Sequence, residues 1–379
     1  MSVPENRIDS CARDLAGRAR TNRRDVAMIG HYQTGSIRWG WVLGLTSLGL
    51  AFAVAAVGAW LWQDIQRFSN VPLNVTSQDA TFDVTRGSHL RGIIRQLRHD
   101  QITSRAPFYW RVLARQMQVD SKLHAGEYEL TPGITPRVLL QKMANGDVRQ
   151  HHFLIVDGWT FRQMRLALAN EPGLKQTLTT LSDAEISREL GIDGDQPEGW
   201  FLPETYAWIK GESDFDVLQR AHQAMRRTLD AQWARRADDL PLKTPYEALI
   251  LASIIERETG IASERADIGG VFTRRLKIGM RLQTDPTVIY GIGASYDGNI
   301  RRRDLDTDTP YNTYTRSGLP PTPIALPGKP AIEAALHPAP GDALYFVAIG
   351  DGSGRHMFSP NLAAHNRAVS DYLKNRRRQ

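Results

Sequence analysis

The most uniform pattern in the chain is an apolar run near its start. From Trp41 to Trp62 the sequence contains no charged residue, and tryptophans stand at both ends. As a helix, these 22 residues would rise about 33 Å, which is enough to cross the hydrocarbon core of a bilayer. Tryptophan is also enriched at both interfaces of a membrane. The pattern predicts a transmembrane helix over residues 38–62.

Positive charge is placed unevenly around this run. Residues 1–38 contain seven arginines, whereas Arg67 alone follows the run immediately. Because positive charge collects on the cytoplasmic side of a membrane, we expect the N-terminus in the cytoplasm and the body of the chain on the opposite side. Residues 1–37 show no clear apolar period, which predicts a flexible cytoplasmic tail.

A local pattern of strand, turn and helix repeats after a polar linker at residues 63–78. The repeats cover residues 81–100, 126–147 and 152–169. Each turn places a hydroxyl residue near a helix N-cap: Ser88, Thr135 and Thr160. The pattern predicts a small α+β module over residues 79–155, which either binds an extended polymer or serves as a spacer.

A larger mixed α+β domain is predicted over residues 156–379. Its first part, to about residue 248, reads as helical with an aromatic and acidic loop at Pro197–Tyr206. The tract from 291 to 340 is rich in loop-forming residues. A last strand is expected at Ala343–Ile349, followed by a glycine turn and a closing helix at Asn361–Leu373.

The segment Leu249–Tyr290 combines an apolar helical pattern with two carboxylates and a polar turn. At about 100° per residue, Glu258 projects into the middle of the apolar arc, whereas Glu256 falls at its edge. A carboxyl group on an apolar face must be paired, hydrogen-bonded or kept protonated by desolvation. Protonation near neutral pH is what a general acid requires. The alternative is a structural charge near a helix C-terminus with an arginine partner.

The composition excludes several kinds of site and ligand. The chain has 379 residues, a formal net charge of +6 and a single cysteine, Cys11. One thiol excludes an intrachain disulfide framework and a cysteine-based zinc site. The histidines lack metal-ligand spacing, so no metal or organic cofactor is indicated. No basic motif interleaved with aromatics supports nucleic-acid binding, and the basic ends are better explained by a membrane.

Several of these stretches together resemble one family. They are ASIIERET (252–259), SERADIGGVFTRRLKIGMRLQTDPTVIYG (263–291), YNTYTRSGLPPTPIALPG (311–328), EGWFLPETY (198–206) and the His365-Asn-Arg pattern. In this order they are similar to the YceG-like, or MltG-type, endolytic murein transglycosylases. The similarity covers most of the chain beyond the apolar run. The tail at 1–37 is longer than the family leads us to expect and has no counterpart in it.

The resemblance implies a single-pass protein of the cell inner membrane with a periplasmic catalytic domain and a LysM-like module at about 79–155. It implies non-hydrolytic cleavage of the β-1,4 bond between N-acetylmuramic acid and N-acetylglucosamine in peptidoglycan glycan strands, leaving 1,6-anhydro ends. Glu258 takes the position of the catalytic glutamate. Peptidoglycan synthases are implied as partners, beside which nascent strands would be cut internally.

Two other functions remain open from the residues themselves. One is a non-catalytic scaffold that binds the cell wall, and the other is a muramidase that uses water. A muramidase would need a second acid about 5–10 Å from the first, for which Asp285 and Glu204 are candidates. If the helical face is read correctly, Glu256→Gln should retain activity.

The supporting residues have alternative roles. Gln283, Thr284 and Asp285 either bind acetamido groups or hold Glu258, and Asp285 alternatively caps the helix that begins at Pro286. Asn312 and Tyr314 contact glycan or satisfy loop backbone, and Tyr290 ends the same segment. Glu198 and Glu204 either pair with Arg274 or Arg275 in a structural role or take part in catalysis. Three loop aromatics stack on sugar rings or fill the core: Trp200, Phe201 and Tyr206.

Overall fold

The computed structural model describes residues 39–377, with side chains from residue 43 onward. The predicted tail at 1–37 lies outside the described residues. Residues 1–63 and 64–379 form two separate units, which are described one at a time. In the described part of the chain the secondary structure is mixed α+β, as predicted, with three antiparallel two-stranded sheets.

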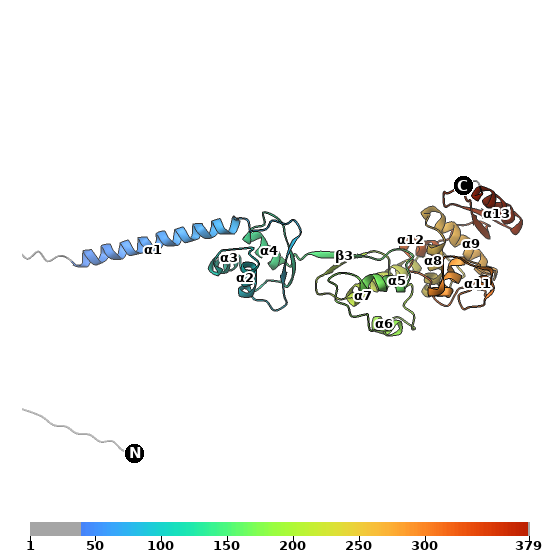
Figure 1. The fold of residues 1–379 in the computed structure, drawn as a ribbon, viewed down its shortest axis with the longest axis horizontal. Coiled ribbons are helices and arrows are strands. Elements are labelled where there is room, and N and C mark those ends of the chain that lie inside the picture. The colour runs from blue at the N-terminus through green and yellow to red at the C-terminus, as the bar shows by residue number, and fades with distance from the viewer. Residues whose placement is uncertain (1–38, 378–379) are drawn as a thin grey trace, which may run out of the picture. The chain divides into compact units, whose positions relative to one another are not determined.

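Helix α1 runs without a break from Trp39 to Asn70 (Figure 1). Its stretch Leu43–Asn70 is long and apolar enough to cross a membrane, and the apolar window is not buried inside the protein. The helix continues beyond the predicted end at residue 62. It does so because Ile65 and Phe68 are buried, at 4% and 2% exposure, so its last turns belong to the folded unit that follows.

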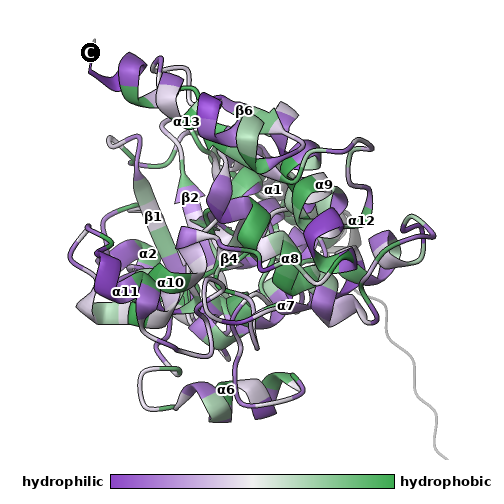
Figure 2. Cartoon of the chain, turned by 90° about the vertical axis from the view of Figure 1, so that its right-hand side faces the viewer, coloured by the Kyte–Doolittle hydropathy of each residue, from purple (hydrophilic) through white to green (hydrophobic). Residues whose placement is uncertain are grey.

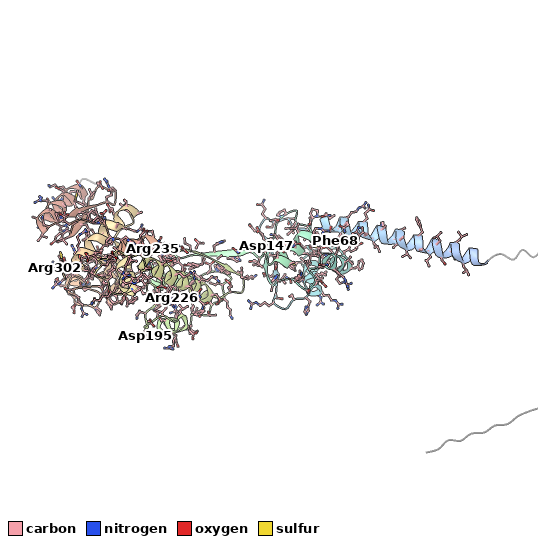
Figure 3. All side chains as sticks on the ribbon, turned by 180° about the vertical axis from the view of Figure 1, so that it is seen from behind. Phe68, Asp147, Asp195, Arg226, Arg235 and Arg302 are labelled. Atoms are coloured by element: carbon pink, nitrogen blue, oxygen red, sulfur yellow. The ribbon has the colours of Figure 1, made fainter. Side chains whose placement is uncertain are left out.

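The second unit begins with a small strand-helix-helix-strand-helix module. Its elements are β1 (Ala80–Val84), α2 (Leu90–His99), α3 (Pro107–Gln116), β2 (Gly126–Leu130) and α4 (Pro136–Asn145). Strands β1 and β2 pair antiparallel with Phe82 opposite Tyr128, and both side chains are fully buried. Phe68 of α1, labelled in Figure 3, packs its ring against Trp110 at 5.4 Å. Helix α3 was not part of the predicted repeat.

In two of the three repeats, the hydroxyl residue predicted near the helix N-cap does cap the helix. Thr135 accepts a hydrogen bond from the N–H of Val138, and Thr160 forms a reciprocal capping box with Gln163. Ser88 lies one residue before the N-cap of α2, which is His89, and it does not cap the helix. The hydroxyl of Ser88 lies 2.7 Å from that of Thr85 instead, so it closes the turn before the helix.

A second sheet brings together segments that are far apart in sequence. The elements here are β3 (Gln150–Leu154), α5 (Phe161–Ala169), α6 (Asp183–Leu190), β4 (Thr205–Ile209) and α7 (Asp214–Trp233). Strand β4 pairs with β3 and includes Tyr206, so the region expected to be helical contains a strand. Phe201 and Tyr206 are buried, and Trp200 stacks on Tyr246 at 5.7 Å. These aromatics fill the core.

The last part of the chain surrounds α8 (Pro245–Glu258). Its other elements are α9 (Arg265–Lys277), α10 (Asp285–Ile292), α11 (Arg302–Asp306), α12 (Lys329–Leu336), β5 (Tyr345–Ala348), β6 (His356–Ser359), α13 (Leu362–Arg376), and the 3₁₀ turns Ala262–Glu264 and Gly293–Ser295. Helix α8 carries hydrophobic residues along much of its length (Figure 2) and packs against α7, α9 and α12. The sequence pattern missed α11, α12 and β6.

Helices α9 and α12 approach closely because Gly269 has no side chain. A Cβ at this position would lie 2.4 Å from the carbonyl oxygen of Ala334, so Gly269→Ala should destabilise the protein by about 1–3 kcal/mol through overpacking. As a control, Gly92 sits in α2 with open space around its missing Cβ. Gly92→Ala should stabilise by about 0.5–1 kcal/mol. Chemical denaturation of the full chain measures both, and equal effects would contradict this account of the contact.

Candidate active site

Glu258 is the last residue of the most deeply buried helix. Thr244 caps the start of α8 by accepting a hydrogen bond from the N–H of Glu247 at 3.2 Å, and Pro245 occupies the first turn. Every residue from Ala248 to Ile255 is buried, so the helix is covered on all sides here. The backbone turns extended at Thr259. The carboxyl group of Glu258 therefore lies at the end of the helix, just beyond its buried part.

The surroundings of Glu258 favour its neutral form. Burial raises the pKa of its carboxyl group to about 7, and the charge of Asp285 acts in the same direction. A hydrogen bond from the hydroxyl of Thr284 and the charges of His356 and Arg275 pull this pKa down, by less than burial raises it. The negative end of the α8 dipole also disfavours a carboxylate here. Among the described residues no ion pair involves Glu258, so the alternative of a structural charge with an arginine partner is not supported.

The turn that carries Thr284 is fixed by a second segment of the chain. Thr313 accepts a hydrogen bond from the N–H of Thr284 at 3.1 Å, and its carbonyl accepts one from the N–H of Gln283 at 3.2 Å. The hydroxyl of Thr287 donates to the carbonyl of Thr284 at 2.8 Å. These residues are buried except for Gln283, so the hydroxyl of Thr284 is held in place against Glu258.

Gln283 and Asp285 flank Thr284 and are both exposed. Gln283 has a φ of 48°, a left-handed conformation that is unfavourable for a side chain of its kind. Asp285 accepts a hydrogen bond from the hydroxyl of Tyr314 at 2.6 Å. It does not cap α10, because Thr284 occupies the N-cap and Asp285 is the first helical residue. The exposed carboxylate is thus oriented by a tyrosine next to Glu258.

Asn312 supports the loop from within. It is 1% exposed, and its amide donates to the carbonyls of Asp304, Leu305 and Thr307 at 2.7–3.3 Å. Its side-chain oxygen accepts from the N–H of Tyr314 at 2.9 Å. All of its hydrogen-bonding capacity is directed to backbone, which places Tyr314 over Asp285.

Glu198 is a second buried acid with its own partners. It accepts hydrogen bonds from the N–H of Phe161 at 2.8 Å and from the hydroxyl of Tyr290 at 3.2 Å. Burial raises its pKa to about 7 as well. Glu204, in contrast, is paired with Lys329 at the surface.

The predicted pairing of Glu198 and Glu204 with Arg274 or Arg275 is wrong. Both arginines donate to backbone carbonyls instead: Arg274 to Ala343 at 2.7 Å and Arg275 to Leu282 and Leu344, each at 2.6 Å. Arg275 is buried and so ties the loop before the Thr284 turn to the start of β5.

Glu256 is buried too, although the helical wheel placed it at an edge. Its side chain is 4% exposed and forms an ion pair with Arg265 at 3.1 Å. Its other oxygen accepts a hydrogen bond from the N–H of Gly328 at 3.0 Å. Both oxygens are therefore occupied by structural partners, in contrast to those of Glu258.

One pair near Glu258 was not found from the sequence. Glu264 accepts hydrogen bonds from the main-chain N–H of His356 at 3.0 Å and from its ring Nδ1 at 2.8 Å. The two residues are 92 positions apart, so no helical or strand period links them. The only signal in the sequence was that Glu264 lies in one of the family-like stretches, residues 263–291. Within the described part of the chain, no group of three or more acidic, histidine or cysteine side chains is placed to hold a metal.

The raised pKa of Glu258 has a consequence for stability. The folded protein keeps this proton up to about pH 7, whereas the unfolded chain releases it near the ordinary pKa of 4.5. The contribution of this group to stability is therefore full below pH 4.5 and is lost as the pH rises toward 7.

The variant Glu258→Gln cannot ionise and should escape this loss. Its stability relative to the original protein should increase between about pH 4.5 and 7 and remain constant above. Urea unfolding of both proteins across this range measures the difference. A difference that does not change with pH would show that the pKa of Glu258 is the same in the folded and unfolded protein.

Comparison with known proteins accords with this geometry. The YceG-like family matches residues 82–371. A protein of Bacillus subtilis (strain 168) named endolytic murein transglycosylase is 29% identical over 338 residues, which covers 84% of this chain and 90% of that protein. A protein of the same name from Streptococcus pneumoniae serotype 2 (strain D39 / NCTC 7466) is 29% identical over 287 residues and covers 67% of this chain, but only 51% of its own length is matched.

Among solved structures, the 2.6 Å crystal structure of a yceG-like protein from Listeria monocytogenes is 29% identical and aligns with a TM-score of 0.48. The alignment covers 77% of this chain and 99% of the Listeria chain. The family match alone extends over well more than half of the sequence and contains Glu258, the Thr284 turn and Thr313. The chain belongs to the YceG-like family.

Proposed function

We propose that the chain is a membrane-anchored lytic transglycosylase that cleaves peptidoglycan glycan strands. The observation that carries this proposal is the carboxyl group of the half-buried Glu258, which is hydrogen-bonded to Thr284 and has a pKa raised to about 7. Such a group can both donate and accept a proton near neutral pH. The name endolytic murein transglycosylase of two relatives gives the substrate class.

In the first step, protonated Glu258 donates its proton to the glycosidic oxygen between N-acetylmuramic acid and N-acetylglucosamine. The bond from that oxygen to the muramyl C1 breaks as an oxocarbenium-like state develops. The N-acetylglucosamine leaves with a free hydroxyl, and Glu258 becomes a carboxylate. Its short-lived charge is favoured by the Thr284 hydroxyl and by the positive charges of Arg275 and His356.

In the second step, the same carboxylate takes the proton of the muramyl C6 hydroxyl while that oxygen attacks C1. A 1,6-anhydro ring closes, and Glu258 regains its proton. No water is consumed, and the acid returns to its starting state. One carboxyl group suffices because the nucleophile belongs to the substrate and is already close to C1.

Gln283 and Asp285 are proposed to bind the substrate. Both are exposed on either side of Thr284, and the carboxylate of Asp285 is oriented by Tyr314. A carboxylate and an amide in these positions can bind acetamido N–H and carbonyl groups of the sugars. Asn312, Tyr290 and Glu198 are assigned supporting roles, because they are hydrogen-bonded within the protein.

Hydrolysis is the second candidate reaction, and one observation favours it. The charge of Asp285 reaches Glu258, so this carboxylate is available as the second acid of a muramidase, whereas Glu204 is held by Lys329. A water in place of the C6 hydroxyl would then leave reducing ends.

The placement of the chain is also part of this proposal. Helix α1 would cross the inner membrane with the arginine-rich N-terminus in the cytoplasm. The module at 79–155, which we propose to be LysM-like, and the catalytic domain at 156–379 would then face the periplasm, where glycan strands and their synthases are found.

The reaction can be tested on uncrosslinked glycan strands with the purified full chain. Fragments with 1,6-anhydro ends are expected, identified by mass, and Glu258→Gln should lower the rate at least about a hundredfold. The matched control is Glu256→Gln, two residues away. It should lose about 2 kcal/mol of stability with its ion pair but retain turnover in the folded protein.

Reducing ends in the products would support the muramidase, and no cleavage by the original protein would reject both enzymatic functions. If Glu256→Gln were inactive while folded and Glu258→Gln active, the assignment of the acid would be wrong.

The hydrogen bond from Thr284 gives a prediction for the pH profile. Activity should fall as the pH rises above about 7, because ionised Glu258 cannot donate a proton. In Thr284→Val the pKa of Glu258 loses a lowering contribution, so the alkaline limb should move to higher pH while the maximal rate drops. Thr284→Ser keeps the hydroxyl and should restore the original limb. An unmoved limb in Thr284→Val would refute the role of this hydroxyl.

A further inference from the structure

Two neighbouring helices of the small module carry only positive charge. Helices α2 and α3 contain five arginines and no acidic residue. All five are exposed, and none forms an ion pair with an acid in the described part of the chain: Arg91, Arg95, Arg98, Arg111 and Arg115. The charge is thus available to a ligand outside the protein.

A groove between α2 and α3 gathers three of these arginines. It is lined by Arg91, Arg111 and Arg115 together with Phe108, whose side chain is 46% exposed. Asp120 is the one carboxylate among its lining residues. Guanidinium groups around an exposed aromatic ring combine attachment to phosphate with insertion among apolar chains.

The groove uses the face of α3 that points away from the core. Phe108, Arg111 and Arg115 follow one another at spacings of three and four residues and share one side of the helix. Trp110 and Leu113 on the opposite side are fully buried. The outward face is therefore basic and aromatic because of its sequence, and the fold leaves it uncovered.

Helix α3 contacts the end of α1, as does α4, whose Arg137 donates to Gln66 and Ser69 at 3.3 Å. The hydroxyl of Tyr109 donates to Asp64 at 2.5 Å, and the amide of Gln66 donates to Gln116 at 3.3 Å. Ile65, the first buried residue of the module, follows Trp62 by three positions, about 4.5 Å along a helix. In the sequence, the module therefore begins directly after the uncharged run that ends at Trp62.

We propose that this arginine groove binds the phosphate headgroups of anionic lipids at the membrane surface that α1 enters. The inference rests on the proposed anchoring of the chain by α1. Arginine binds phosphate oxygens in a bidentate way, and basic surfaces beside a membrane helix are attracted to anionic lipid. The exposed ring of Phe108 among the guanidinium groups favours a lipid, which offers both a phosphate and apolar chains, over a soluble polar polymer.

Native mass spectrometry of the full chain in neutral detergent tests the proposal. With added phosphatidylglycerol, the protein should retain more lipid than with phosphatidylcholine. The triple variant Arg91→Gln, Arg111→Gln, Arg115→Gln should reduce retained phosphatidylglycerol at least about tenfold. Inorganic phosphate should not displace the lipid, because it lacks the apolar chains that the exposed ring of Phe108 would contact beside the guanidinium groups.

The matched control removes the same charge from exposed arginines elsewhere in the chain. Arg188→Gln, Arg226→Gln, Arg227→Gln alters α6 and α7, where Arg226 is labelled in Figure 3, and should retain phosphatidylglycerol. Equal losses in both triple variants, displacement by inorganic phosphate, or displacement by soluble glycan strands would each overturn the proposal. Cleavage of soluble strands in detergent should be unchanged by the groove variant, so failure of lipid binding is distinguished from failure of the enzymatic function.

Discussion

The hydrogen bond between the Thr284 hydroxyl and the Glu258 carboxyl joins the two halves of the site. One partner is the last residue of a helix buried on all sides, and the other belongs to a turn built by a separate segment of the chain. Burial and the end of the helix favour a neutral acid, whereas the hydroxyl and nearby cations favour its anion. A carboxyl group balanced in this way exchanges a proton readily near neutral pH.

Much of the surrounding structure positions that one contact. Thr313 and Thr287 fix the turn, and Asn312 holds the loop that carries Thr313. Arg275 contributes positive charge while its donors are directed to backbone carbonyls. It can therefore influence Glu258 without forming an ion pair, which would keep the acid permanently ionised. Glu256 shows the opposite arrangement two residues earlier, with both oxygens bound by structural partners.

Sequence patterns correctly predicted those structural features that are determined by residues close together in the chain. The helix ending at Glu258, the apolar span and the caps at Thr135 and Thr160 follow from local spacing. Strand β4 and the pair Glu264–His356 were missed because their partners are distant in sequence. The helical wheel singled out Glu258 but could not show that Glu256 is buried as well. The pairing of Glu198 with Arg274 or Arg275 was wrong for a similar reason. Both arginines donate instead to backbone carbonyls of residues 343 and 344, which are distant in sequence.

The contact between Glu264 and His356 also concerns the order in which the chain is made. Ribosomes synthesise proteins from the N-terminus, so α8 exists well before residue 356 leaves the ribosome. Until then Glu264 lacks both hydrogen bonds, and Glu258 lacks one of its neighbouring positive charges. The acid reaches its final electrostatic environment only when β6 is in place near the end of the chain. The carboxyl group of Glu258 therefore gains its full surroundings only after β6 has been synthesised and packed against Glu264.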